Sequence, residues 1–235
     1  MTPIITPIVL CKNEEYWIFH VLSALVSVFP HVVVADTGST DSTLEQIAKV
    51  PNIHLMSFSN LSPKEVGLCR GWMQDEAREK FGATHVFLCD ADELYPRKYL
   101  QFIKDNPMPE NALSGFTYGV ECTELENGEC WLLGWPDGHP VGVSRQAVFS
   151  VDSKWHGTYP FESPDTFKAG DLTNYYWQSM DSSYHFYHLH QMRRSSKDGD
   201  VYLRKQKQYQ FSMIEHPEIV PTEFWIKSRD EYIDE

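Results

Sequence analysis

A short apolar run that ends at three carboxylates restricts the fold of this chain most. It occupies residues 85–93, His-Val-Phe-Leu-Cys-Asp-Ala-Asp-Glu. A run that is apolar on both faces predicts a strand buried in a parallel sheet, where ligands bind just beyond the carboxyl ends of the strands. Asp90 and Asp92 would point the same way in an extended chain, so they could share one cation, or a cation and a ribose. The plainer interpretation is an Asp-rich turn before a helix that starts near Pro96.

Three earlier segments repeat the order of apolar strand and then helix. The strands are expected at residues 7–11, 32–35 and 53–58. The helices after them are expected to be capped by Asn13, by Thr40 or Asp41 before a helix at residues 44–50, and by Ser62. Four such alternations with short connections predict an α/β fold with a mostly parallel, doubly wound sheet flanked by helices. Glu14 and Asp36 follow the first two strands, so both are expected at the same edge of the sheet as Asp90.

The charge balance limits the partners of the chain. Its 20 Lys and Arg against 33 Asp and Glu give a formal net charge of -13, which argues against a nucleic-acid partner. The five cysteines form no CxxC pair and predict reduced thiols rather than a disulfide framework. No apolar segment looks long enough to span a bilayer, so we expect a soluble, cytoplasmic protein without a transmembrane segment. Peripheral attachment to a membrane stays open.

The second half holds fewer regular patterns. Residues 115–122 predict one more strand, and residues 131–151 are rich in Gly, Pro and aromatic residues, as in long loops. The aromatic side chains there and just beyond could form a platform for sugar rings or simply bury surface; they are Trp131, Trp135 and Trp155. Residues 183–194 contain three histidines followed by two arginines, a density that indicates a site better than a solitary histidine does.

Taken together, the motifs resemble those of one enzyme family. Lys12-Asn13-Glu14, the run from Asp36 to Asp41, Arg70 and the DxD motif Asp90-Ala91-Asp92 occur in the order and at the spacing of family 2 glycosyltransferases of the GT-A fold. The resemblance covers roughly the first half of the chain. It departs from many relatives at Gly71, where they have asparagine after the arginine.

The resemblance implies a single domain over residues 1–235. Residues 1–122 would form the half that binds the nucleotide sugar, and residues 123–235 an elaborated half that binds the acceptor and completes the site. The donor would be a nucleoside-diphosphate sugar, most often a UDP sugar, and the acceptor a hydroxyl of a glycan or another molecule. A divalent metal, Mn²⁺ or Mg²⁺, would bind the diphosphate. The enzyme would then be a glycosyltransferase of the hexosyltransferase type.

Roles in the donor site follow residue by residue from the resemblance. Glu14 and Asp36 would face the base and ribose, Asp90 the ribose, and Arg70 the nucleotide. Asp92 would bind the metal.

The histidine-rich segment would complete the metal site. A histidine followed five residues later by an arginine recurs in this branch of the family, and that spacing selects His188 with Arg193. His188 would bind the metal, and Arg193 or Arg194 would neutralise the charge of the diphosphate, with Asp90 and His190 as reserve metal ligands.

The resemblance also implies inversion at the anomeric carbon. A carboxylate of the second half would deprotonate the acceptor hydroxyl, and the candidate bases are Glu162, Asp165 and Asp137. Two alternatives stay open: a non-catalytic relative that binds nucleotide sugars or glycans, and a nucleotidyltransferase. The sequence disfavours the second alternative, because residues 12–15 replace the Gly-rich basic loop that usually follows its first strand.

Overall fold

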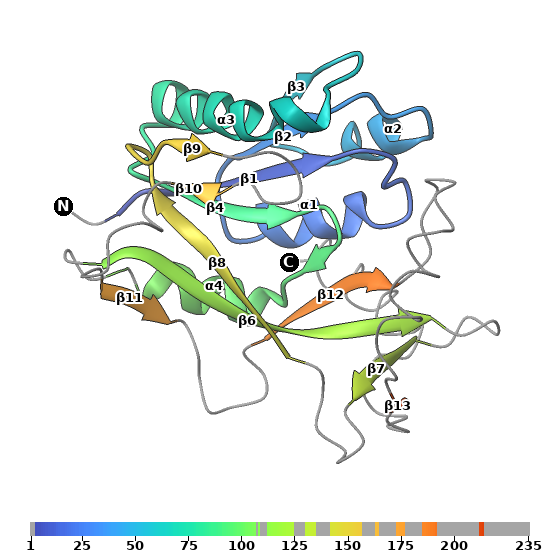
Figure 1. Cartoon of the computed structure of the whole chain (residues 1–235). Helices are drawn as coiled ribbons and strands as arrows, with labels where there is room; N and C mark the ends of the chain where they lie inside the picture. Colours follow the sequence, from blue (N-terminus) through green and yellow to red (C-terminus); the bar gives the residue numbers. More distant parts are fainter. Residues whose placement is uncertain are drawn as a thin grey trace.

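A computed structural model of the 235-residue chain describes residues 3–106, 108, 112–124, 130–134, 142–156, 163–164, 173–176, 185–191 and 212–213. Within these ranges the chain forms an eleven-stranded mixed sheet, a small two-stranded sheet and the helices that cover them (Figure 1). The expected α/β fold is confirmed. None of the helices in these ranges is long and apolar enough to cross a membrane.

The first half of the chain builds the parallel part of the sheet. The strands β1 (Ile5–Cys11), β2 (Val32–Asp36), β3 (Ile53–Ser57) and β4 (His85–Asp90) lie in the order β3-β2-β1-β4, and each neighbouring pair is parallel. In the ladders Cys11 is opposite Asp36 and Leu10 is opposite Asp90. The strands therefore end at one edge, and the turns that follow them come together there.

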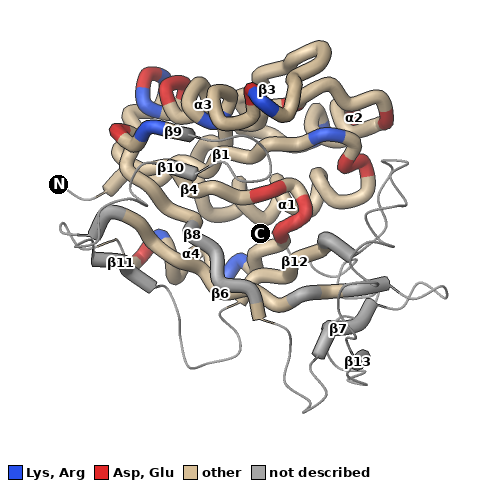
Figure 2. Tube along the Cα trace, viewed as in Figure 1, with Lys and Arg blue, Asp and Glu red and all other residues tan. Residues whose placement is uncertain are grey.

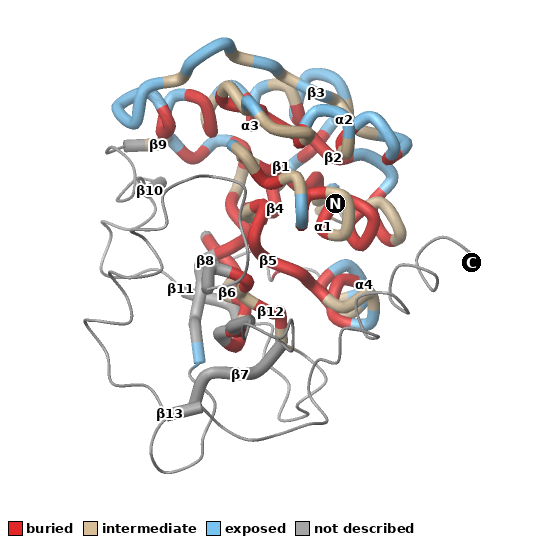
Figure 3. The backbone as a smooth tube through the Cα atoms, turned by 90° about the vertical axis from the view of Figure 1, so that its right-hand side faces the viewer, coloured by how far each residue is buried: buried red, intermediate tan, exposed pale blue. Residues whose placement is uncertain are grey.

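Helices cover both faces of this sheet. The helices α1 (Ile18–Val26), α2 (Thr43–Ile47) and α4 (Arg97–Asp105) supply buried residues to the core on one face, and α3 (Val66–Phe81) supplies them on the other. The strand residues alternate accordingly: Val34 faces the first core, whereas Val33 and Ala35 face the second. Figure 3 shows buried residues running through β1, β2 and β4. This double covering explains why the strands read as continuous apolar runs.

The second half continues the sheet with mixed pairing. The strand β8 (Gly142–Ser150) lies antiparallel between β4 and β6 (Ala112–Glu124), and β7 (Cys130–Gly134) pairs antiparallel with the end of β6. On the other edge of β6, β12 (Phe186–Gln191) runs parallel to it and antiparallel to β5 (Glu93–Leu94). Four short strands complete the sheets: β9 (Trp155–His156), β10 (Ser163–Pro164), β11 (Thr173–Tyr176) and β13 (Ser212–Met213).

Three local expectations need correction. Asn13 does not cap a helix, because α1 begins five residues later at Ile18 and Asn13 adopts a left-handed backbone with φ +57°. The second helix begins at Thr43 with Ser42 at the N-cap position, but Asp41, one of the two expected caps, does accept the backbone N–H of Thr43 at 3.0 Å. The region of residues 131–151, expected to form loops, contributes β7 and β8 instead.

Candidate functional site

The turns after β1 and β2 are held together by a network of hydrogen bonds. The backbone N–H of Asn13 donates to Ser39 Oγ (2.8 Å), and the N–H of Thr40 donates back to Asn13 Oδ1 (2.8 Å). The N–H of Glu14 donates to Thr43 Oγ1 (2.7 Å), and Glu14 is buried. Asn13 has a positive φ, and this backbone conformation lets its side chain accept the bond from Thr40. Asparagine tolerates a positive φ better than most residues do. Two motifs that lie apart in the sequence thus form one structural unit.

Asp36 lies at the end of β2 with only 1% of its surface exposed. Its carboxylate accepts hydrogen bonds from the backbone N–H groups of Gly38 (3.3 Å) and Ser39 (3.2 Å) and from the Ser39 hydroxyl. Gly38 has φ +104°, and a Cβ there would lie 2.7 Å from the Ser59 carbonyl oxygen. The turn therefore fixes the direction of the Asp36 carboxylate and requires glycine at position 38.

A buried thiol lies close to the acids at this edge. Cys11 ends β1, and its Sγ lies 4.0 Å from Asp36 Oδ1. Burial raises the pKa of the Cys11 thiol well above its ordinary value. The nearby carboxylates raise it further, and Asp36 has the largest effect among them. The thiol therefore stays protonated at neutral pH.

Arg70 supplies such a positive charge to the end of β4. It lies just over one turn into α3 and is 3% exposed, and its Nη2 is 3.2 Å from Asp90 Oδ1. The Asp90 side chain is 26% exposed, so it can pair with Arg70 and still meet a ligand. The third acid of the run has a structural role, because Glu93 is fully buried and accepts the Asp90 backbone N–H at 3.0 Å. Figure 2 shows these acids at the carboxyl end of β4.

His188 approaches the same acids from the second half of the chain. The antiparallel pairing of β12 with β5 sets His188 opposite Glu93, and the N–H of Leu189 donates to the Asp92 carbonyl oxygen (2.7 Å). His188 Nε2 then lies 3.8 Å from Asp92 Oδ2, with the two side chains 12% and 8% exposed. The pair offers one nitrogen and one oxygen donor, which fit Mn²⁺ or Mg²⁺ only if other donors complete the shell. Among the described residues no group of three or more His, Cys, Asp and Glu is placed to hold a metal.

Several expected site residues cannot be placed. Glu162, Asp165, Asp137 and Arg193 lie outside the described residues, although Glu162 and Asp165 directly precede and follow β10 in the sequence. His190 belongs to β12, but its side chain is not among those described. The same holds for the side chain of Trp131 in β7, and Trp135 lies outside the described ranges.

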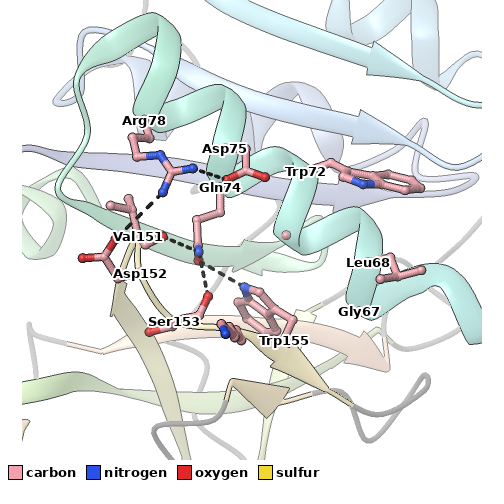
Figure 4. Close-up of a pocket in the computed structure, with 12 residues that line it drawn as sticks. Gly67, Leu68, Trp72, Gln74, Asp75, Arg78, Val151, Asp152, Ser153 and Trp155 are labelled. Atoms are coloured by element: carbon pink, nitrogen blue, oxygen red, sulfur yellow. Dashed lines mark hydrogen bonds and ion pairs between the residues drawn. The ribbon is translucent and has the colours of Figure 1, made fainter.

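A cavity of about 490 Å³ lies between α3 and the segment after β8 (Figure 4). Its walls include Trp72, Arg78, Asp152 and Trp155, and it contains none of the acids of the edge. Trp155, a candidate for a sugar platform, has its ring 5.7 Å from the Arg70 guanidinium carbon. Trp155 therefore borders the cavity and also contacts the arginine that pairs with Asp90.

Comparisons with known proteins place the chain beside glycosyltransferases of solved structure. No protein-family model matches it, and no curated protein does. One similar structure is Staphylococcus aureus TarS residues 1–349, with 19% identity over 63% of this chain and 47% of that chain and a TM-score of 0.38. A second is the mannosyltransferase PcManGT from Pyrobaculum calidifontis in complex with GDP-Man and Mn²⁺, with 22% identity over 53% and 36% and a TM-score of 0.39.

A third is glucosyl-3-phosphoglycerate synthase from Mycobacterium tuberculosis in complex with Mn²⁺, UDP and phosphoglyceric acid. It shares 18% identity over 48% of this chain and 42% of that chain, with a TM-score of 0.36. These structural neighbours are GT-A glycosyltransferases. The chain spans less than half the length of each.

Proposed function

We propose that this chain is a metal-dependent, inverting glycosyltransferase. It would take a nucleoside-diphosphate sugar, with a UDP sugar favoured, and transfer the sugar to a hydroxyl of a glycan or another acceptor. The supporting observation is that Arg70 and His188, from distant parts of the chain, both approach the acids that follow β4. An Asp-rich turn that served only to begin a helix would need neither a buried arginine nor a histidine from another strand.

The donor half of the site would use the edge of the parallel strands. The Asp90 side chain pairs with Arg70 and is 26% exposed, so a ribose hydroxyl would reach its carboxylate. Glu14 and Asp36 would face the base and ribose from the joined turns. Arg70, through its guanidinium group, would offset the negative charge of the nucleotide.

Asp92 and His188 would hold the divalent ion, Mn²⁺ or Mg²⁺, with the diphosphate and water supplying the remaining donors. Bound there, the ion would neutralise charge that develops on the departing diphosphate. Arg193, five residues after His188, would add a second positive charge.

The transfer itself would need one base. A carboxylate, with Glu162, Asp165 and Asp137 as candidates, would take the proton of the acceptor hydroxyl. The hydroxyl oxygen would then bond to the anomeric carbon as the bond from that carbon to the phosphate oxygen breaks, and the nucleoside diphosphate would leave with the bonding electrons. Residues 1–235 would act as one domain in this scheme, with the nucleotide bound by residues 1–122 and the acceptor by residues 123–235.

Titration calorimetry with UDP and GDP, each with Mn²⁺ and with EDTA, tests the donor site. We expect the protein to bind one diphosphate in a manganese-dependent manner and Asp92→Asn to weaken that binding more than tenfold, because the variant loses a charged metal ligand. The matched control is Asp105→Asn, an exposed acid at the end of α4 that should leave binding unchanged.

Each result decides between the candidate functions. A folded protein that binds neither diphosphate would contradict the proposal. Binding without turnover of any sugar nucleotide would support the non-catalytic relative. If transfer occurs, replacing each candidate base by its amide should show which one abolishes turnover while the diphosphate still binds.

A further inference from the structure

Gln74 forms three hydrogen bonds from a buried position on α3. It is 4% exposed, and its amide nitrogen donates to the carbonyl oxygens of Val151 (2.6 Å) and Ser153 (2.8 Å). Its amide oxygen accepts the indole N–H of Trp155 at 3.1 Å. Figure 4 shows these contacts joining α3 to the segment after β8. Both amide hydrogens are therefore used, and the orientation of the amide group is determined.

The contacts continue from Gln74 to the candidate donor site. The ring of Trp155, which Gln74 holds by its N–H, lies against the Arg70 guanidinium with 5.7 Å between the ring centroid and Cζ. The guanidinium in turn bonds Asp90 at 3.2 Å. Arg70 and Gln74 are four residues apart on α3, so both side chains project from the same side of the helix.

We propose that Gln74 is a positioning residue of the donor site and that it acts through Trp155 and Arg70 on Asp90. An arginine has several rotatable bonds, so an ion pair alone does not fix the plane of its guanidinium. A ring held at a set angle removes that freedom, and the restraint is effective because burial limits competition from water. The part of this inference that concerns nucleotide binding rests on the proposed function; the link from Gln74 to Arg70 does not.

The competing interpretation is that Gln74 only fastens residues 151–155 to α3. Its loss would then lower stability without changing the surroundings of Arg70. Trp155→Phe tests the second step, from the ring to Arg70, because it keeps both bonds from Gln74 to the carbonyl groups and replaces the indole, with its N–H, by a smaller ring. Gln74→Met removes all three bonds at similar side-chain length. Gln101→Met, at an exposed glutamine of α4 that bonds Asp105, is the matched control.

The first measurement uses the protein without nucleotide. In protein labelled with ¹⁵N-arginine, the Arg70 Nε–H signal is assigned by its absence in Arg70→Lys, and its exchange with solvent is measured by NMR. We expect Gln74→Met and Trp155→Phe to shift this signal and to speed its exchange about tenfold, since the guanidinium becomes free to reorient. Gln101→Met should leave it unchanged. If the signal does not change in the folded variants, the link from Gln74 to Arg70 is contradicted.

The second measurement is the affinity for UDP in the presence of Mn²⁺. Both variants should bind about five- to tenfold more weakly than the wild-type protein and the Gln101→Met control. A changed Arg70 signal with unchanged UDP affinity would overturn the positioning role. A wild-type protein that binds no UDP would contradict the proposed function, and the Arg70 signal would still decide the link. If Gln74→Met does not fold, Trp155→Phe carries both measurements.

Discussion

At the scale of single residues, the acids at the edge of the sheet have different roles despite equal charge. Glu93 is buried and bonds a backbone N–H, whereas Asp90 and Asp92 approach the cationic or titratable side chains of Arg70 and His188. Asp36 bonds its own turn. Sequence spacing could place these acids at one edge of the sheet. It could not show which acids bond the backbone of a turn and which approach Arg70 or His188, because these partners come from elsewhere in the chain.

The contribution of Asp36 to the stability of its turn can be measured by substitution. Asp36→Ala leaves the N–H groups of Gly38 and Ser39 without their carboxylate, and hydrogen bonds to charged groups contribute about 1.5–3 kcal/mol each. We expect the free energy of unfolding in urea to fall by at least about 3 kcal/mol, because two such bonds are lost. Asp105→Ala on the exposed face of α4 should change it by less than about 0.5 kcal/mol. Equal stability of the two variants would show that the turn does not depend on the carboxylate.

Alanine substitutions at two glycines with positive φ can separate the cost of backbone strain from the cost of a steric clash. Gly82 has φ +65° and open space where a methyl group would lie, so Gly82→Ala should cost about 1 kcal/mol of unfolding free energy from backbone strain alone. Gly38 has φ +104°, and a Cβ would also meet the Ser59 carbonyl oxygen at 2.7 Å. Gly38→Ala should therefore be the more destabilising change in urea unfolding. The opposite order would mean that the turn after β2 can move away from Ser59.

At the scale of elements, the start of α3 was well predicted from local sequence. Ser62-Pro63 suggested a cap followed by proline, and the structure has a 3₁₀ turn, η1 (Pro63–Glu65), with a full capping box before α3. The Ser62 hydroxyl and backbone N–H both donate to the Glu65 carboxylate, at 2.6 and 3.0 Å. These bonds, the hydroxyl first, lower the pKa of the Glu65 carboxyl below its ordinary value.

The lowered pKa gives the capping box a defined pH dependence. A carboxyl whose pKa is lower in the folded state stabilises the protein above its unfolded pKa, and the effect is lost as the pH falls through the lower, folded pKa. Glu65→Gln should therefore be less stable than the wild-type protein at pH 7, and the difference should shrink as the pH falls below 4.5. Urea unfolding of both proteins over this range measures it. A difference that does not vary with pH would exclude the carboxylate charge as its cause.

Elements beyond the parallel strands were harder to predict. The first four strands and their helices follow from apolar runs and caps that lie within a few residues of one another. Strand β8 does not, because a region rich in Gly and aromatic residues has no clear period, and its place between β4 and β6 is set by partners far away in the sequence. The sequence offers one local indication of a role for Gln74, which is its position one turn after Arg70. Its three hydrogen-bond partners follow β8, far away in the sequence, so the sequence does not reveal them.

At the scale of the whole molecule, β12 links the second half of the chain to the core of the first. Phe186 is fully buried and stacks on Tyr95 with 4.7 Å between the ring centroids. A Cβ on Gly119 of β6 would lie 2.4 Å from the Phe186 ring, so the glycine makes room for it. This packing fixes the strand that carries His188. The sequence pattern selected His188 and Asp92 separately, but their contact is a product of tertiary packing.

Two similarly buried phenylalanines can test whether this packing serves the site. Phe186→Ala and Phe29→Ala both empty a buried ring from the same core, so each should lower the free energy of unfolding by about 3–5 kcal/mol. At a temperature where both variants remain folded, only Phe186→Ala should weaken manganese-dependent UDP binding, because His188 lies two residues further along β12 and Phe29 follows the end of α1. Calorimetry measures the binding and urea unfolding the stability. If both variants lost affinity equally, general loss of stability would explain the effect, and the packing of Phe186 would have no particular role in nucleotide binding.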